Sequence, residues 1–196
     1  LFRHNFTISP NYSEIEELTF VPGKKETPTV PEEKREVERI GGDDRIDTAG
    51  KVSGKYYSYA DNAIIARKDE FPDALTASVL AKALNAPILL TDTNKLDERV
   101  AKELKRLGVK KAYIIGRENA ISEFTESEIK KITGDTERIG GSDRYETSSL
   151  VANKVVSLVG KKGRAVVSTG QDFADSLSIS PYAAKMGYPI LLVKQN

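Results

Sequence analysis

Apolar residues between positions 63 and 132 gather in short runs that alternate with segments of helical periodicity. The runs at 63–67, 87–91 and 112–115 predict buried strands, because four or five consecutive apolar residues are typical of a strand covered on both faces. Helices are predicted between and after them, at residues 72–84, 96–107 and 122–132. Strands separated by helices favour parallel pairing with right-handed crossovers, so we expect α/β three-layer units with short parallel strands.

The chain repeats itself, and the repeat defines its organisation. Residues 38–49 (ERIGGDDRIDTA) and 137–148 (ERIGGSDRYETS) are identical at eight of twelve positions, at an offset of 99. Residues 63–90 match residues 165–192 at ten of 28 positions, at an offset of 102. We therefore expect tandem units at 38–136 and 137–196. The second has no counterpart for the last part of the first, so we expect it to be truncated, in a fragment of a longer protein.

The first 37 residues have a different character. Residues 1–20 carry irregularly spaced apolar side chains and are interpreted as the remnant of an upstream module. Residues 21–37 combine three prolines with many charges. Proline lacks an amide donor and restricts the preceding residue, so this segment is predicted to be an irregular linker.

The amino-acid composition excludes several kinds of functional site and partner. The 196 residues are 39% hydrophobic and 30% charged, which supports a folded core, and the formal net charge is only +1. With so small a net charge, the protein is not strongly attracted to nucleic acid or to membranes by electrostatics, so neither is expected as a partner. The chain has no Cys and a single His, His4, which excludes disulfides, thiol nucleophiles and multi-histidine sites. Asp92 is followed two residues later by Asn94, so a paired-carboxylate metal site is poorly supported, and neither catalysis nor a cofactor is expected.

A glycine pair followed by an acid and an arginine occurs twice, at 41–45 (GGDDR) and 140–144 (GGSDR). Two interpretations stay open. Glycine amides, a helix N-terminus and the side chains of Arg45 and Arg144 could form an anion site. Alternatively, the motif is a capped turn in which each arginine bonds to a nearby carbonyl or carboxylate.

A second pair of candidates is Asp73 and Asp175, each just after a predicted strand. Ligands of open α/β sheets bind at the carboxyl ends of the strands, so these acids could bind sugar hydroxyls or a cation, or simply cap a helix. Together with Arg45 and Arg144 they are our candidate ligand-binding residues. The third duplicated motif is an apolar strand expected to be core, made of Ile88, Leu89 and Leu90 and of Ile190, Leu191 and Leu192.

The order of these motifs (RIGGxDRxxT, FxDAL, NAPILLT, LGxKKAYIIG, then ERIGGSDRYET) resembles the type 2 cell-wall-binding repeat of Gram-positive surface proteins, including clostridial S-layer and cell-wall proteins. The resemblance covers residues 37–196. It implies Toprim-like α/β units and a secreted protein at the cell wall or S-layer. It also implies non-covalent anchoring to an anionic, phosphate-bearing wall polysaccharide, with the Ile-Leu-Leu motif associated with anchoring. Expected partners are that polymer and further repeats, of the same protein or of a partner chain.

Two other functions remain open from the residues. One is a fragment of an α/β enzyme that binds nucleotide or phosphate, which saturable nucleotide binding in the presence of magnesium would indicate. The other is a structural spacer whose repeats pack only on each other or on partner repeats.

Overall fold

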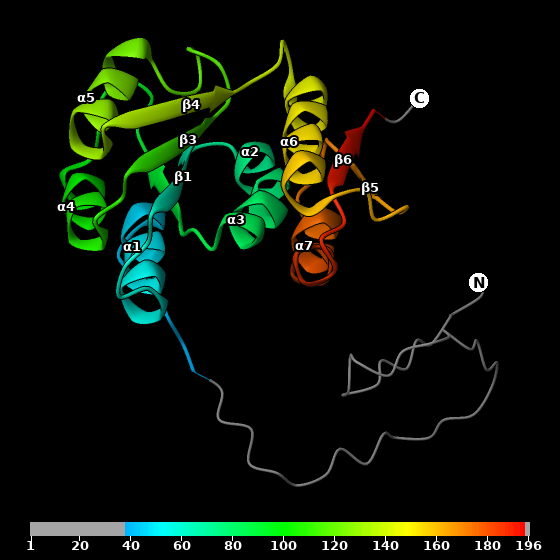
Figure 1. The fold of residues 1–196 in the computed structure, drawn as a ribbon, viewed down its shortest axis with the longest axis horizontal. Helices are drawn as coiled ribbons and strands as arrows, with labels where there is room; N and C mark the ends of the chain where they lie inside the picture. Colours follow the sequence, from blue (N-terminus) through cyan, green and yellow to red (C-terminus); the bar gives the residue numbers. More distant parts are fainter. Residues whose placement is uncertain (1–37, 195–196) are drawn as a thin grey trace, which may run out of the picture. The chain divides into compact units, whose positions relative to one another are not determined.

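The computed structural model describes residues 38–194 (Figure 1). The expected upstream remnant at 1–20 and the linker at 21–37 lie outside the described residues, and both stay predictions.

The first sheet consists of four parallel strands in the order β2-β1-β3-β4. The three predicted strands are confirmed, with adjusted ends: β1 (Asn62–Arg67), β2 (Ile88–Thr91) and β3 (Lys111–Ile115). The fourth, β4 (Asp135–Ile139), was not predicted. Ile139 is its only buried side chain, so its apolar pattern is weak. β4 also crosses the expected boundary between the units at residue 136.

The second copy contributes a two-stranded parallel sheet, β5 (Val166–Thr169) and β6 (Ile190–Val193). Ile64 pairs with Ile88 in the first copy, and Val166 pairs with Ile190 in the second, so the register repeats 102 residues later. Both copies begin with a helix, a strand, a helical segment and a second strand, although that segment is two helices in the first copy and one in the second. The duplicated α/β architecture is therefore confirmed.

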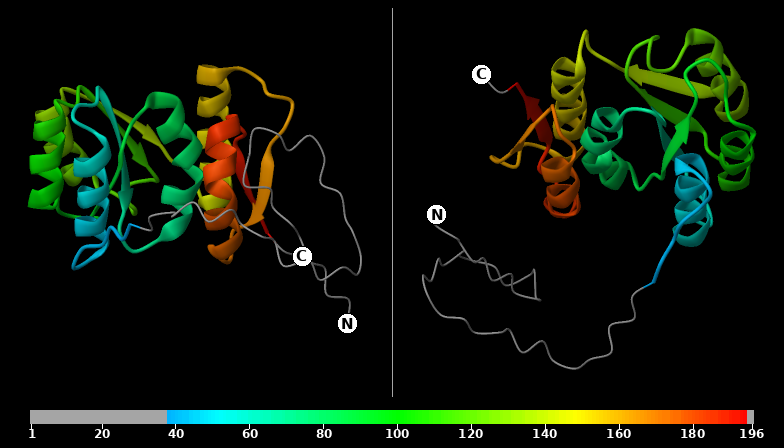
Figure 2. Two further views of the ribbon diagram at one scale, coloured as in Figure 1. Left: turned by 90° about the horizontal axis from the view of Figure 1, so that it is seen from below. Right: turned by 180° about the vertical axis from the view of Figure 1, so that it is seen from behind.

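Helices cover both faces of the first sheet (Figures 1 and 2). One face is covered by α1 (Arg45–Tyr56), α4 (Glu98–Leu107) and α5 (Glu123–Thr133). The other carries α2 (Phe71–Thr76) and α3 (Ser78–Leu84). The single helix predicted at 72–84 is thus two short ones, separated at Ala77. Side-chain hydroxyls of Thr76 and Ser78 donate to backbone carbonyls of the preceding turn, which competes with regular helix geometry.

The two copies share a core. On the second face, α2 and α3 pack against α6 (Arg144–Val159) and α7 (Ala174–Met186), which belong to the second copy, and α6 also contacts β4. Val155 of α6 lies in the same buried cluster as Ile64 and Ile115 of the first sheet. The second copy therefore completes the core of the first and fixes the N-terminus of α6 beside the first sheet. No helix in the range 38–194 is both long and apolar enough to cross a membrane.

Candidate ligand-binding site

The duplicated glycine motif builds the N-terminus of α6 as a closed hydrogen-bond network. The Gly141 amide donates to the Thr147 hydroxyl at 3.0 Å, and the Ser142 amide donates to the Glu146 carboxylate at 2.6 Å. Asp143 is the N-cap and accepts from the Glu146 amide at 2.8 Å. The bond from Ser142 holds the pKa of the Glu146 carboxyl below its usual range. These amides already have partners within the motif and are not available to an anion.

The N-terminus of α1 is built in the same way. The Gly42 amide donates to the Thr48 hydroxyl at 3.0 Å, and the Asp43 amide donates to the Asp47 carboxylate at 3.0 Å. Asp44 is the N-cap. The motif thus caps a helix in both copies.

Both motif arginines bond to backbone. Arg45 Nη1 donates to the Lys68 carbonyl at 3.0 Å, and Arg144 Nη1 donates to the Gly170 carbonyl at 2.8 Å. Lys68 and Gly170 are equivalent positions, each directly after the first strand of its copy. Each arginine therefore fastens a helix N-terminus to the carboxyl end of a strand, as the capped-turn interpretation described.

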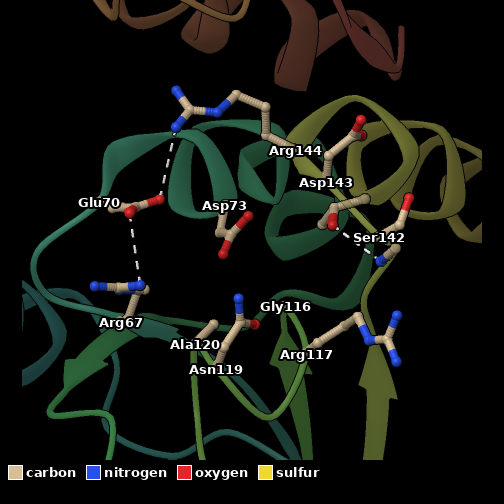
Figure 3. A pocket seen from close by; sticks show the side chains of 12 residues that line it. Arg67, Glu70, Asp73, Gly116, Arg117, Asn119, Ala120, Ser142, Asp143 and Arg144 are labelled. Carbon is tan, nitrogen blue, oxygen red and sulfur yellow. Dashed lines mark hydrogen bonds and ion pairs between the residues drawn. The ribbon is translucent and has the colours of Figure 1, made fainter.

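A polar cavity of about 230 Å³ lies where the carboxyl ends of the first sheet meet the N-terminus of α6 (Figure 3). We call it the junction cavity, because both copies line it. Of the four candidate ligand-binding residues, the structure places Asp73 and Arg144 in this lining and Arg45 and Asp175 outside it. The side chains that give it its polar character are Arg67, Glu70, Asp73, Arg117, Asn119, Ser142, Asp143 and Arg144.

Asp73 projects into the junction cavity (Figure 3) and is 9% exposed. Gly116, with a φ of 97°, leaves room for it, since a Cβ there would lie 2.9 Å from Asp73 Oδ2. Burial, assisted by the charge of Glu70, raises the pKa of the Asp73 carboxyl, while Arg67 and Arg144 oppose the rise. Among the described residues, no side chain or backbone group bonds to the Asp73 carboxylate. An acceptor to which no described group bonds thus faces the cavity.

The arginines of the cavity differ in how firmly they are held. Glu70 lies between two of them, 3.6 Å from Arg67 Nη1 and 3.8 Å from Arg144 Nη2. Arg117 has one ion pair, with the adjacent Glu118 at 3.6 Å, and its side chain is 57% exposed. Arg117 is therefore the cation most available to a ligand. Sequence reasoning missed it, and also Asn119, because the turn after β3 has no counterpart in the second copy.

The remaining candidates lie elsewhere. Asp175 is exposed in the first turn of α7. The Ile-Leu-Leu motif lies in strands β2 and β6, where Leu89 and Ile190 are each 1% exposed, Leu192 is buried, and Ile88, Leu90 and Leu191 are half-buried. Residues 38–194 contain no group of three or more His, Cys, Asp or Glu side chains placed to hold a metal ion.

Short parallel strands repeated in tandem, with a polar cavity at the junction of the copies, define a repeat-built α/β binding module. The chain belongs to the family described as Cell wall binding domain 2 (CWB2), whose model matches residues 39–126 and 138–196. The resemblance found from the motifs is thereby confirmed.

Relatives agree with this assignment. The N-acetylmuramoyl-L-alanine amidase LytC of Bacillus subtilis (strain 168) is 38% identical over 160 residues, which are 82% of this chain and 32% of that protein. The amidase enhancer of the same strain is 35% identical over 159 residues, or 81% and 22% of the two chains. The solved structure of Cwp8 from Clostridium difficile has a TM-score of 0.72 and 34% identity, covering 79% of this chain and 27% of that one. The chain is a cell-wall-binding module of the cell wall and surface, and it spans about a third or less of these relatives.

Proposed function

We propose that this module anchors its protein non-covalently to an anionic, phosphate-bearing wall polysaccharide, and that it does so without catalysis. The observation that supports this is the junction cavity, which gathers Arg67, Arg117 and Arg144 from two copies around one space. Arginine pairs with phosphate through two parallel hydrogen bonds, so such a cluster suits a phosphate-bearing ligand.

We also propose that the binding residues act as halves of a site between consecutive repeats. Asp73 comes from the first copy and Arg144 from the second, and both line the junction cavity. Asp175 and Arg45 are their equivalents at offsets of 102 and 99. Each would become part of a site only where a further repeat, from the same protein or a partner chain, lies against it. Several such sites along a repetitive polymer would raise the overall affinity through avidity.

Co-sedimentation with purified Gram-positive cell walls tests the choice of polymer. Walls treated with hydrofluoric acid lose polymers held by phosphodiester bonds, so the module is expected to pellet with untreated walls and to stay in solution with treated ones. Binding to untreated walls is also expected to weaken as salt rises, because counterions screen arginine–phosphate attraction. Equal binding to treated and untreated walls would contradict the proposal.

Arg144→Gln with its matched control Arg45→Gln tests the residues. Each variant loses a hydrogen bond to a carbonyl, so each is expected to lose about 0.5–1.5 kcal/mol of unfolding free energy. Only Arg144 lines the junction cavity, so only Arg144→Gln is expected to weaken wall binding as well. Equal wall binding by the two variants would show that both arginines have only a structural role.

The enzyme-fragment alternative is tested by titrating nucleotide in the presence of magnesium. The proposal expects no saturable binding and no turnover. Saturable binding that competes with cell walls would favour the alternative.

A further inference from the structure

We propose that the junction cavity takes one hydroxylated, acidic sugar unit, with Asp73 accepting hydrogen bonds from its hydroxyl groups and Arg117 pairing with its phosphate. The inference rests on the proposed function and specifies its ligand. A sugar phosphate is the chemical class that carries both groups.

The charges that line the cavity favour a ligand of mixed character over a bare anion. Three arginines face three acids there, namely Glu70, Asp73 and Asp143, so the formal charge of the lining cancels. Asp143 already caps α6, and Glu70 lies between two arginines. Asp73 is the acid without a bonded partner, and its charge repels a bare phosphate. A ligand that brings hydroxyl donors together with its phosphate satisfies both Asp73 and the arginines.

The Asp73 carboxylate in the cavity lacks a partner that such a ligand supplies. The residue as a whole is 9% exposed, and no described group donates a hydrogen bond to its carboxylate, which opens onto the cavity (Figure 3). A carboxylate with so little access to water is stabilised by donors that a ligand brings. Sugar hydroxyls are such donors.

The other side chains that line the cavity also suit hydrogen bonds to the polar groups of a sugar. Asn119, exposed at the rim, has no side-chain hydrogen bond to a described residue and offers both an amide donor and an acceptor. Arg117, on the opposite side of the view from Arg67 in Figure 3, is only loosely paired and is exposed enough to reach a phosphate outside the cavity. Among the lining residues whose side chains the structure describes, none is aromatic. A volume of about 230 Å³ suits one monosaccharide unit rather than an oligosaccharide.

Calorimetric titration with glucose 6-phosphate, glucose and inorganic phosphate tests the inference on four proteins: wild type, Asp73→Asn, Arg117→Gln and the control Glu98→Gln. Wild type is expected to bind glucose 6-phosphate most tightly. Asp73→Asn is expected to weaken glucose 6-phosphate binding about tenfold, yet to tighten binding of inorganic phosphate, because repulsion is removed. Arg117→Gln is expected to weaken both. The control is exposed and outside the cavity, so it should match wild type.

Two results of the titration would overturn the inference. Absence of saturable glucose 6-phosphate binding to wild type is one, and tighter binding of both phosphates by Asp73→Asn is the other, since Asp73 would then only repel. Melting temperatures of all variants verify folding. Co-sedimentation separates this inference from the proposed function: wild-type pelleting of Asp73→Asn and Arg117→Gln with untreated walls overturns the inference alone. Loss of the difference between untreated and acid-treated walls overturns the proposed function.

Discussion

The two copies share helix caps and strand register, yet they differ in what surrounds them. Ile65 in β1 is 0% exposed, whereas its equivalent Val167 in β5 is 62% exposed. Asp73 is buried in the junction cavity, whereas Asp175 is exposed. β1 lies between β2 and β3, while β5 pairs with β6 alone among the described strands. The glycine motif therefore forms its capped turn from residues of its own copy, whereas the candidate site requires residues of the neighbouring copy as well.

This comparison separates two roles within one motif. The hydrogen bonds of Thr48 and Thr147 are identical in length and internal to their copies. The cavity, in contrast, is lined from the second copy by the N-terminus of α6, held in place by the shared core around Val151 and Val155. Matched substitutions at equivalent positions can distinguish these roles.

The largest expected difference is in the Ile-Leu-Leu motif. Leu89 is 1% exposed in the core under α1 and α4, whereas Leu191 is half-buried. Leu89→Ala is therefore expected to lower the unfolding free energy by about 2–5 kcal/mol, and Leu191→Ala by roughly half as much or less. Urea denaturation measures both. Equal losses of unfolding free energy would show that Leu89 and Leu191 are equally buried in solution.

The glycine pair gives the next largest difference. A Cβ at Gly140 would lie 2.6 Å from the Gly116 carbonyl oxygen, whereas a Cβ at Gly41 would meet no described atom within 4 Å. Gly140→Ala is expected to cost about 1–3 kcal/mol through overpacking, and Gly41→Ala less than about 0.5 kcal/mol. Thermal unfolding followed by circular dichroism compares them. A tolerated Gly140→Ala would argue against the close approach of β4 to the turn after β3.

The smallest expected effect concerns pH. Burial raises the pKa of Asp73 above its unfolded value, so the folded state retains the proton to higher pH than the unfolded state. The stability that this proton supports is present below about pH 4 and is lost as pH rises through the folded pKa. Asp73→Asn is therefore expected to raise the melting temperature at pH 7 and to leave it nearly unchanged at pH 3.

Asp175→Asn is the control for that experiment, because Asp175 is exposed. It is expected to follow wild type at both pH values. A stabilisation of the same size at pH 3 and pH 7 would show that ionisation of Asp73 is not its cause.

The local pattern of apolar residues predicted much of the fold, but it missed one polar strand and the contacts between residues that are distant in the sequence. The runs that became β1, β2 and β3 are apolar enough to be recognised, whereas β4 (Asp135–Ile139) is too polar, and its last residues were interpreted only as the start of the next repeat. The motif spacing identified the helix starts. It could not show that Arg45 and Arg144 bond to carbonyls, because those partners are 23 and 26 residues away.

The candidate site was only half predictable. Asp73 and Arg144 were recognised because they are duplicated. Arg117 and Asn119 occur once, in a turn without a repeat partner, and only the fold brings them to the cavity. A site at the junction of two copies therefore combines residues that have an equivalent in the other copy with residues that have none. A sequence repeat identifies only the residues with an equivalent.

The most direct test of a ligand site at the junction is an NMR titration of amide chemical shifts with soluble, phosphate-bearing fragments of wall polymer. The shifts are expected to concentrate at residues 67–73, 116–120 and 140–144, around the junction cavity, with little change near Asp175. Shifts that gather equally around Asp175 and Arg45, or that spread over surface lysines and leave residues 116–120 unchanged, would contradict this expectation.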